Sequence, residues 1–150
     1  MIVLGIDPGI GRMGWGVIKA GSPEVALGFG CIETKAGEEG QRLLVLAKQL
    51  RILFKRHKPT AVAIERLFFT KNQRTAMTVA HARAIARMVC AEFNVPTVEL
   101  IPTRVKSVVG GSGTIKKSDL QRLIQKQLSL KELPRPDDAA DALAIALAGA

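Results

Sequence analysis

The sequence of 150 residues predicts one α/β domain, a mixed five-stranded sheet flanked by helices. Short connections between the first three apolar runs predict an antiparallel meander. Helical periodicity between the later runs predicts parallel strands joined by right-handed crossovers. A hydrophobic fraction of 47% supplies a core, and no linker or repeat divides the chain. We therefore expect a single domain over residues 1–150.

Turn signals delimit the first half of the domain. Strands are predicted over residues 2–6, 14–19 and 25–33, with a turn at Gly21-Ser22-Pro23 before the third. A helix follows whose apolar residues recur every three to four positions, and Pro59 ends it. These residues are Leu43, Leu46, Ala47, Leu50, Leu53 and Phe54.

In the second half of the chain, capping signals mark the predicted helix starts. A buried strand is predicted over 61–64, then a long helix over 73–92 opened by a capping box of Thr70 and Gln73, then a strand over 97–101. The helix 73–92 is apolar on more than one face, so one face is left for another helix or a second subunit. Two further helix starts are predicted, at the capping box of Ser118 and Gln121 and at Asp137.

The charge balance indicates the partner. Lysine and arginine number 22 against 13 acids, a net charge of +9 that is typical of a nucleic-acid binder. No apolar run approaches the roughly 20 residues that span a bilayer, and no basic leader precedes the first strand. Cys31 and Cys90 fit no metal spacing and are expected to be free buried thiols. These observations predict a cytoplasmic protein without membrane contact.

Four acids stand at unusual positions. Asp7 and Glu65 end predicted buried strands, where an unpaired carboxylate is costly. Asp138 and Asp141 lie three residues apart on one face of the last helix. Asp7 also suits a turn, and Asp138 suits the helix dipole, but the dipole explains the deeper Asp141 poorly.

Carboxylates are the ligands that Mg²⁺ prefers. We expect Asp7, Glu65, Asp138 and Asp141 to hold two Mg²⁺ ions, with Mn²⁺ as a substitute, for hydrolysis of a nucleic-acid backbone.

Two further segments indicate contact with DNA. Phe68 and Phe69 precede a helix beside polar residues, so we expect Phe68 to stack on a base and Phe69 to pack on the protein. The glycine-rich stretch 110–117 is expected to be a mobile phosphate-contacting loop, and it lacks the P-loop pattern. The other predicted contacts are Lys71, Asn72, Arg74, Arg104, Lys106, Lys116 and Lys117.

Several of these residues form motifs that resemble those of a known family. The chain resembles the bacterial Holliday junction resolvase family RuvC from residue 1 to 150, with the motifs in order. The motifs are Gly5-Ile6-Asp7-Pro8-Gly9, Gly14-Trp15-Gly16, Ile64-Glu65, Phe68-Phe69, Lys71-Asn72 and Asp138-Ala139-Ala140-Asp141-Ala142-Leu143. The chain departs from the usual pattern at Gly11, Trp15 and residues 81–84.

This resemblance implies a ribonuclease-H-like fold and a homodimer that nicks two opposing strands of a four-way DNA junction. It implies that the four acids are catalytic metal ligands, that Phe68 meets a junction base, and that Lys106 and Lys117 act near the scissile phosphate. A branch-migration helicase is the implied partner.

Three alternatives compete with this reading. The motif at residues 5–9 also resembles the phosphate loop of sugar-kinase and actin-like ATPases, but those need two such domains. A non-catalytic nucleic-acid binder explains the charge but not Asp141. A related nuclease of RNA–DNA hybrids would share the acids.

Overall fold

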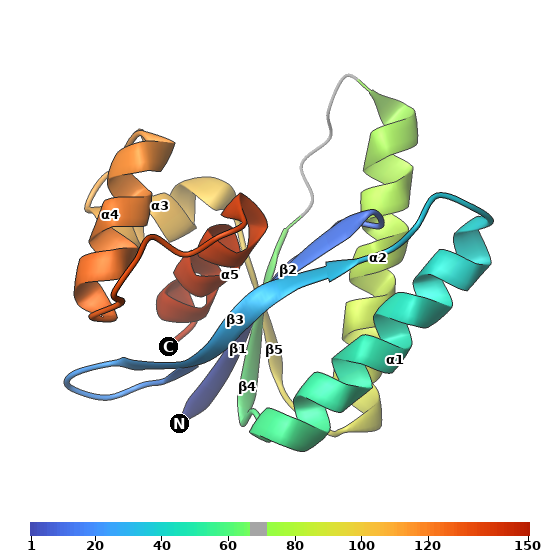
Figure 1. The fold of residues 1–150 in the computed structure, drawn as a ribbon, viewed down its shortest axis with the longest axis horizontal. Helices are drawn as coiled ribbons and strands as arrows, with labels where there is room; N and C mark the ends of the chain where they lie inside the picture. Colours follow the sequence, from blue (N-terminus) through green and yellow to red (C-terminus); the bar gives the residue numbers. More distant parts are fainter. Residues whose placement is uncertain (67–71) are drawn as a thin grey trace.

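The computed structural model describes residues 1–66 and 72–150, and within them five strands form one sheet (Figure 1). The strands are β1 (Ile2–Asp7), β2 (Arg12–Lys19), β3 (Val25–Glu33), β4 (Ala61–Glu65) and β5 (Thr97–Leu100). Their order across the sheet is β3-β2-β1-β4-β5. The central β1 is apolar and almost wholly buried, as its sequence predicts.

The predicted pairing is confirmed. The strands β1, β2 and β3 form an antiparallel meander, whereas β4 pairs in parallel with β1 on one side and with β5 on the other. The mixed five-stranded sheet is therefore the one expected. The strand β2 begins at Arg12, two residues earlier than predicted, and β5 ends at Leu100, one residue earlier.

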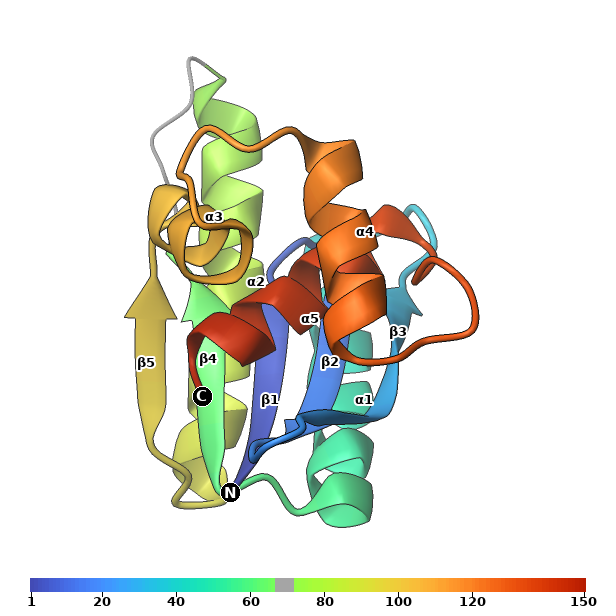
Figure 2. The ribbon, with the colours of Figure 1, turned by 90° about the vertical axis from the view of Figure 1, so that its left-hand side faces the viewer.

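Helices cover both faces of the sheet (Figures 1 and 2). They are α1 (Glu39–His57), α2 (Gln73–Glu92), α3 (Pro102–Gly110), α4 (Lys117–Gln127) and α5 (Asp137–Ala148). One core lies between the sheet and α1 with α2, and a second lies between the other face and α3, α4 and α5. Each helix within the described ranges is too short or too polar to span a bilayer.

The helix α3 was not expected from the sequence. It starts at Pro102, two residues after β5 ends. Its valines at positions 105, 108 and 109 have helical spacing, but they span little more than one turn, which is too short to indicate a helix in the sequence. The glycine-rich stretch is thus shorter than predicted, because Gly110 ends the helix. Gly111 follows in the left-handed conformation at φ 74° and closes it.

The predicted helix caps differ from the observed ones. Asn72 caps α2 by accepting a hydrogen bond from the backbone N–H of Thr75, while Thr70 lies outside the described residues. The α4 N-cap is Lys116 and the α5 N-cap is Pro136, neither with a side-chain cap bond. Ser118 and Asp137 therefore lie inside the helices that they were expected to cap. Asp137 still favours its helix start through the dipole.

The helix α5 lies directly on the backbone of the sheet. A Cβ atom on Gly5 would lie 2.1 Å from the carbonyl oxygen of Ala142, and one on Gly14 would lie 2.0 Å from that of Asp138. No larger residue fits at either position without moving the helix. Because Gly14 is the register partner of Asp7, this contact places the start of α5 beside the end of β1.

Replacing Gly5 by Ala should therefore displace α5 and destabilise the protein by about 1–3 kcal/mol or more. Gly21→Ala is the matched control, since its nearest atom would lie 3.6 Å away, and its effect should stay within about 0.5 kcal/mol. Denaturant unfolding measures both. Equal stabilities of the two variants would show that α5 does not depend on this contact.

Candidate active site

Two acids lie side by side at one edge of the sheet. Asp7 is the last residue of β1 and Glu65 the last of β4, and these parallel strands pair with Ile6 beside Ile64. Their carboxyl ends meet at the same edge, which is where open α/β sheets bind ligands. The main-chain register thus brings together two residues that are 58 positions apart in the sequence (7 and 65).

The helix α5 brings the other two acids to the same edge. Asp138 lies in its first turn, and its carbonyl oxygen faces Gly14, the partner of Asp7. Asp141 follows one turn later. The side chains of Asp138 and Asp141 remain 30% and 33% exposed, so both are partly open to solvent and to a ligand.

The neighbouring acids change the protonation of Asp7 and Glu65. Burial is the largest cause that raises the pKa of Asp7 to about 8, and the charges of Glu65, Asp141 and Asp138 add to it. Burial and the charge of Asp141 also raise the pKa of Glu65. Glu65, Asp138 and Asp141 therefore lie within electrostatic reach of Asp7, and the positive charge near Asp7 does not fully offset theirs.

Two basic side chains offset part of this charge. Lys117 donates a hydrogen bond from Nζ to Oδ2 of Asp141 at 2.8 Å, and its Nζ lies 3.7 Å from Oδ2 of Asp137. Arg12 places Nε 3.4 Å from Oδ2 of Asp138. Partial burial is the largest single influence on the pKa of Lys117 and lowers it. The hydrogen bond to Asp141 and the charges of Asp141, Asp137 and Asp7 together raise the pKa above its usual value, so the amine carries its charge.

The donor set suits a hard divalent cation. Three carboxylates crowded beside the half-buried Asp7 complete a set of four, which offers the oxygen ligands and the negative charge that Mg²⁺ or Mn²⁺ binds. Among residues 1–66 and 72–150, however, no group of three or more potential ligands is arranged to hold a metal ion as it stands. The ion pairs of Asp138 and Asp141 give a reason: these carboxylates are turned toward Arg12 and Lys117.

The predicted phosphate-contacting residues lie on two helices beside this cluster. Lys106 is half-buried in α3, where its charge, with that of Lys117, opposes the rise in the pKa of Glu65. Arg104 is exposed on α3, and Lys116 is exposed immediately before α4. Both lysines of the predicted pair are thus within electrostatic reach of an acid.

The predicted aromatic segment is only partly described. Phe68, Phe69 and Lys71 lie outside the described residues. Asn72 caps α2, a structural role that the sequence interpretation as a DNA contact did not include. Arg74 is exposed in the first turn of α2.

Sequence reasoning missed the residues that hold the turn after Asp7. Thr34 donates from its hydroxyl to the carbonyl oxygen of Ile10 at 2.6 Å, and Arg42 donates from Nε to that hydroxyl at 2.9 Å. Arg12, at the end of this turn, bridges Asp138 and, at 3.6 Å, Glu33. No local pattern reveals these contacts, because the partners come from distant parts of the chain.

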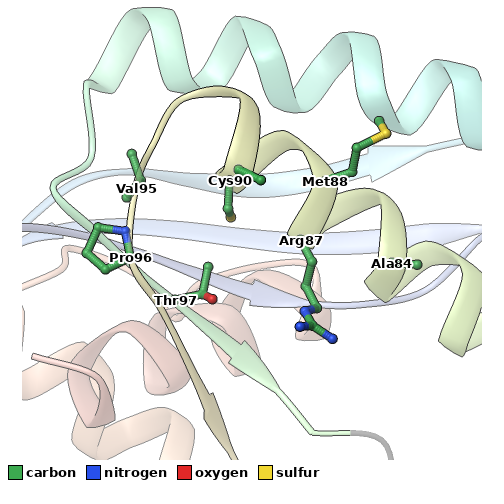
Figure 3. A pocket seen from close by; sticks show the side chains of 8 residues that line it. Ala84, Arg87, Met88, Cys90, Val95, Pro96 and Thr97 are labelled. Carbon is green, nitrogen blue, oxygen red and sulfur yellow. The ribbon is translucent and has the colours of Figure 1, made fainter.

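A groove of about 510 Å³ lies at the other end of the sheet, away from the acids (Figure 3). It is formed by the last turns of α2 and by residues 95–97 at the start of β5, whereas Asp7 and Glu65 end strands parallel to β5. Met88 and Arg87 are among its lining side chains. The groove is therefore separate from the candidate catalytic cluster.

Comparison with known sequences identifies one family. The family model described as "Crossover junction endodeoxyribonuclease RuvC" matches residues 3–149. A protein of that name from Thermomicrobium roseum is 44% identical over 148 residues, which cover 98% of this chain and 91% of the relative. Another from Prochlorococcus marinus is 44% identical over 152 residues, covering 99% and 97%.

Comparison with solved structures agrees with the comparison of sequences. The structure described as "T. thermophilus RuvC in complex with Holliday junction substrate" superposes with a TM-score of 0.93 at 33% identity, covering 99% of this chain and 92% of that one. The yeast mitochondrial Holliday junction resolvase Ydc2 has a TM-score of 0.68 at 17% identity, covering 97% and 77%, and shares the fold.

The raised pKa of Asp7 gives a prediction for the metal-free protein. Since the pKa rises from 3.8 to about 8 on folding, the folded state holds an extra proton between these values and loses stability as the pH rises through them. Asp7→Asn carries no charge, so it should raise Tm relative to wild type by more at about pH 9 than at about pH 5. Each kcal/mol moves Tm by about 2–4 °C at this size.

Thermal unfolding in a chelator measures this difference. Asp119→Asn is the control, because Asp119 is an exposed acid in the first turn of α4, and its effect on Tm should be the same at both pH values. A pH-independent effect of Asp7→Asn would mean that Asp7 is not crowded by the other acids.

Proposed function

The chain belongs to the RuvC family of crossover junction endodeoxyribonucleases, and on this basis we propose that it resolves four-way DNA junctions by metal-dependent nicking of two opposing strands. The observation that carries the proposal is the crowding of three carboxylates around the half-buried Asp7, inside a chain of net charge +9. A basic surface attracts the polyanion, and an acidic cluster within it attracts the cation that DNA hydrolysis requires.

The residues have separate roles in this proposal. The metal ligands are Asp7, Glu65, Asp138 and Asp141, which would hold Mg²⁺, with Mn²⁺ as a substitute. A bound divalent cation supplies activation of the attacking water and stabilisation of the leaving oxygen. Lys106 and Lys117 steady the charge that develops on the scissile phosphate. Their placement on α3 and α4, next to the acids, supports this role.

The DNA contacts extend from this cluster. The segment between Glu65 and α2 follows a proposed metal ligand directly in the sequence, and for this reason we propose that it contacts DNA bound there. Contacts proposed on this side are Phe68, Phe69, Lys71, Asn72 and Arg74, and on the α3–α4 side Arg104 and Lys116. The basic residues position phosphates and do not read bases.

The proposed substrate has two-fold symmetry, and symmetric cleavage needs a two-fold enzyme. An exposed apolar stripe on α2 supports a homodimer. Met77 and Met88 are 61% and 41% exposed, and the exposed Ala84 and Ala91 continue the same face. Ala84, Met88 and Ala91 also line the groove of Figure 3, so a second copy would cover both features.

By family membership we also propose a branch-migration helicase as partner and the cytoplasm as location.

Variants of the acids test the reaction. Asp7→Asn and Asp141→Asn should keep junction binding but lose nicking by about 100-fold or more, because metal stabilisation of the transition state is worth several kcal/mol. The control Asp119→Asn should nick normally. Gel assays would compare a four-way junction, a duplex and an RNA–DNA hybrid, with and without Mg²⁺.

Full nicking by an Asp7→Asn, Asp141→Asn double variant would overturn the metal-ligand assignment. Preferential cleavage of the hybrid would assign the fold to a different nuclease activity. Tight ATP binding without junction binding would favour the ATPase alternative.

The proposed dimer surface has its own test. Met88→Glu places a charge in the middle of the α2 stripe, which should shift the protein from dimer to monomer. Ile52→Glu on α1 is the control, because Ile52 is 54% exposed on another helix and should leave the mass unchanged. Sedimentation or light scattering measures the mass, and an unaltered dimer in Met88→Glu would move the interface elsewhere.

A further inference from the structure

Lys117 occupies the position of a counter-ion within the acidic cluster. It is the first residue of α4, and its Nζ lies 2.8 Å from Oδ2 of Asp141 and 3.7 Å from Oδ2 of Asp137. Its charge also acts on Asp7 and Glu65, the acids at the ends of β1 and β4. One ammonium group therefore interacts electrostatically with acids from three elements: β1, β4 and α5.

Asp141 cannot serve Lys117 and a metal ion equally well. The hydrogen bond from Lys117 directs Oδ2 of Asp141 toward the amine. Among the described residues, no group of three or more potential ligands is arranged to hold a metal ion. A divalent cation at this cluster would also repel the nearby ammonium. The amine and the cation thus compete for the same carboxylate.

The ion pair between Lys117 and Asp141 can break at low cost. The Lys117 side chain is 52% exposed, and an exposed ion pair of this kind is worth only about 0–1 kcal/mol. The lysine stem is long and flexible, and the helix start that carries it has no side-chain cap bond. A divalent cation has twice the charge and binds several carboxylates at once, so it wins the competition.

We propose that Lys117 is the counter-ion of Asp141 in the metal-free protein and that a divalent cation displaces it, which frees the amine to meet a DNA phosphate. This inference rests on the proposed metal-dependent function. It implies reciprocal coupling: Lys117 weakens cation binding, and the bound cation exposes Lys117. The lysine then reaches the phosphate only after the cation is in place.

Calorimetric titration with Mn²⁺ tests the first half. Lys117→Met removes the charge and keeps much of the stem, so it should bind Mn²⁺ about fivefold more tightly or better than wild type. Lys116→Met is the matched control, because it removes the same charge one residue away, from an exposed side chain. Its affinity should stay within about twofold of wild type.

Chemical labelling of the wild-type protein tests the second half. The rate at which an amine-reactive reagent modifies Lys117, followed by mass spectrometry, should rise when Mn²⁺ is added, while that of Lys116 should not. This measurement does not depend on whether a variant folds.

Two results would overturn the inference: Lys117→Met affinity equal to or weaker than wild type, or Lys117 labelling that is indifferent to Mn²⁺. A wild-type protein that binds no Mn²⁺ would overturn the inference and the proposed metal site together. A protein that releases Lys117 on binding Mn²⁺ but cleaves no junction would support the inference and contradict the proposed function, so the two failures are distinguishable.

Discussion

The direct contact between α5 and the sheet is the constraint on which the rest of the structure depends. The glycines at positions 5 and 14 leave no space for a side chain, so the helix backbone rests on β1 and β2. The first turn of α5 is thereby fixed against the residue that pairs with Asp7. Without that contact, Asp138 and Asp141 would have no defined position relative to the strand ends. The close packing at these glycines therefore fixes where the acids of α5 lie relative to Asp7.

The electrostatic consequence follows from this packing. Four carboxylates gathered at one edge need positive charge, and the protein has three sources for it: a proton on Asp7, the basic side chains of Lys117 and Arg12, or a divalent cation. The first two describe the metal-free state. The third is the state in which we expect chemistry, because only a divalent cation can bind several carboxylates and also activate water. The surplus of basic residues elsewhere brings the phosphate to the same place.

Local sequence patterns predicted most of the fold, because strand pairing and the longer helices depend on periodicity and connection length. They failed where the signal was tertiary. The apolar pattern of α3 spans little more than one turn, and α4 and α5 begin after Lys116 and Pro136 without a side-chain cap bond. The convergence of the acids could be expected from adjacent parallel strands. The pairing of Lys117 with Asp141, and of Arg12 with Asp138, could not, because these pairs join elements whose relative placement no local pattern contains.

We propose that Asp7, Glu65 and Asp141 share a divalent cation. The most direct measurement is anomalous scattering from crystals of the protein soaked with Mn²⁺. We expect an anomalous peak bonded to carboxylate oxygens of Asp7 and of at least one acid from each of β4 and α5. Peaks confined to single acids at separate places, or no peak at this edge of the sheet, would contradict it.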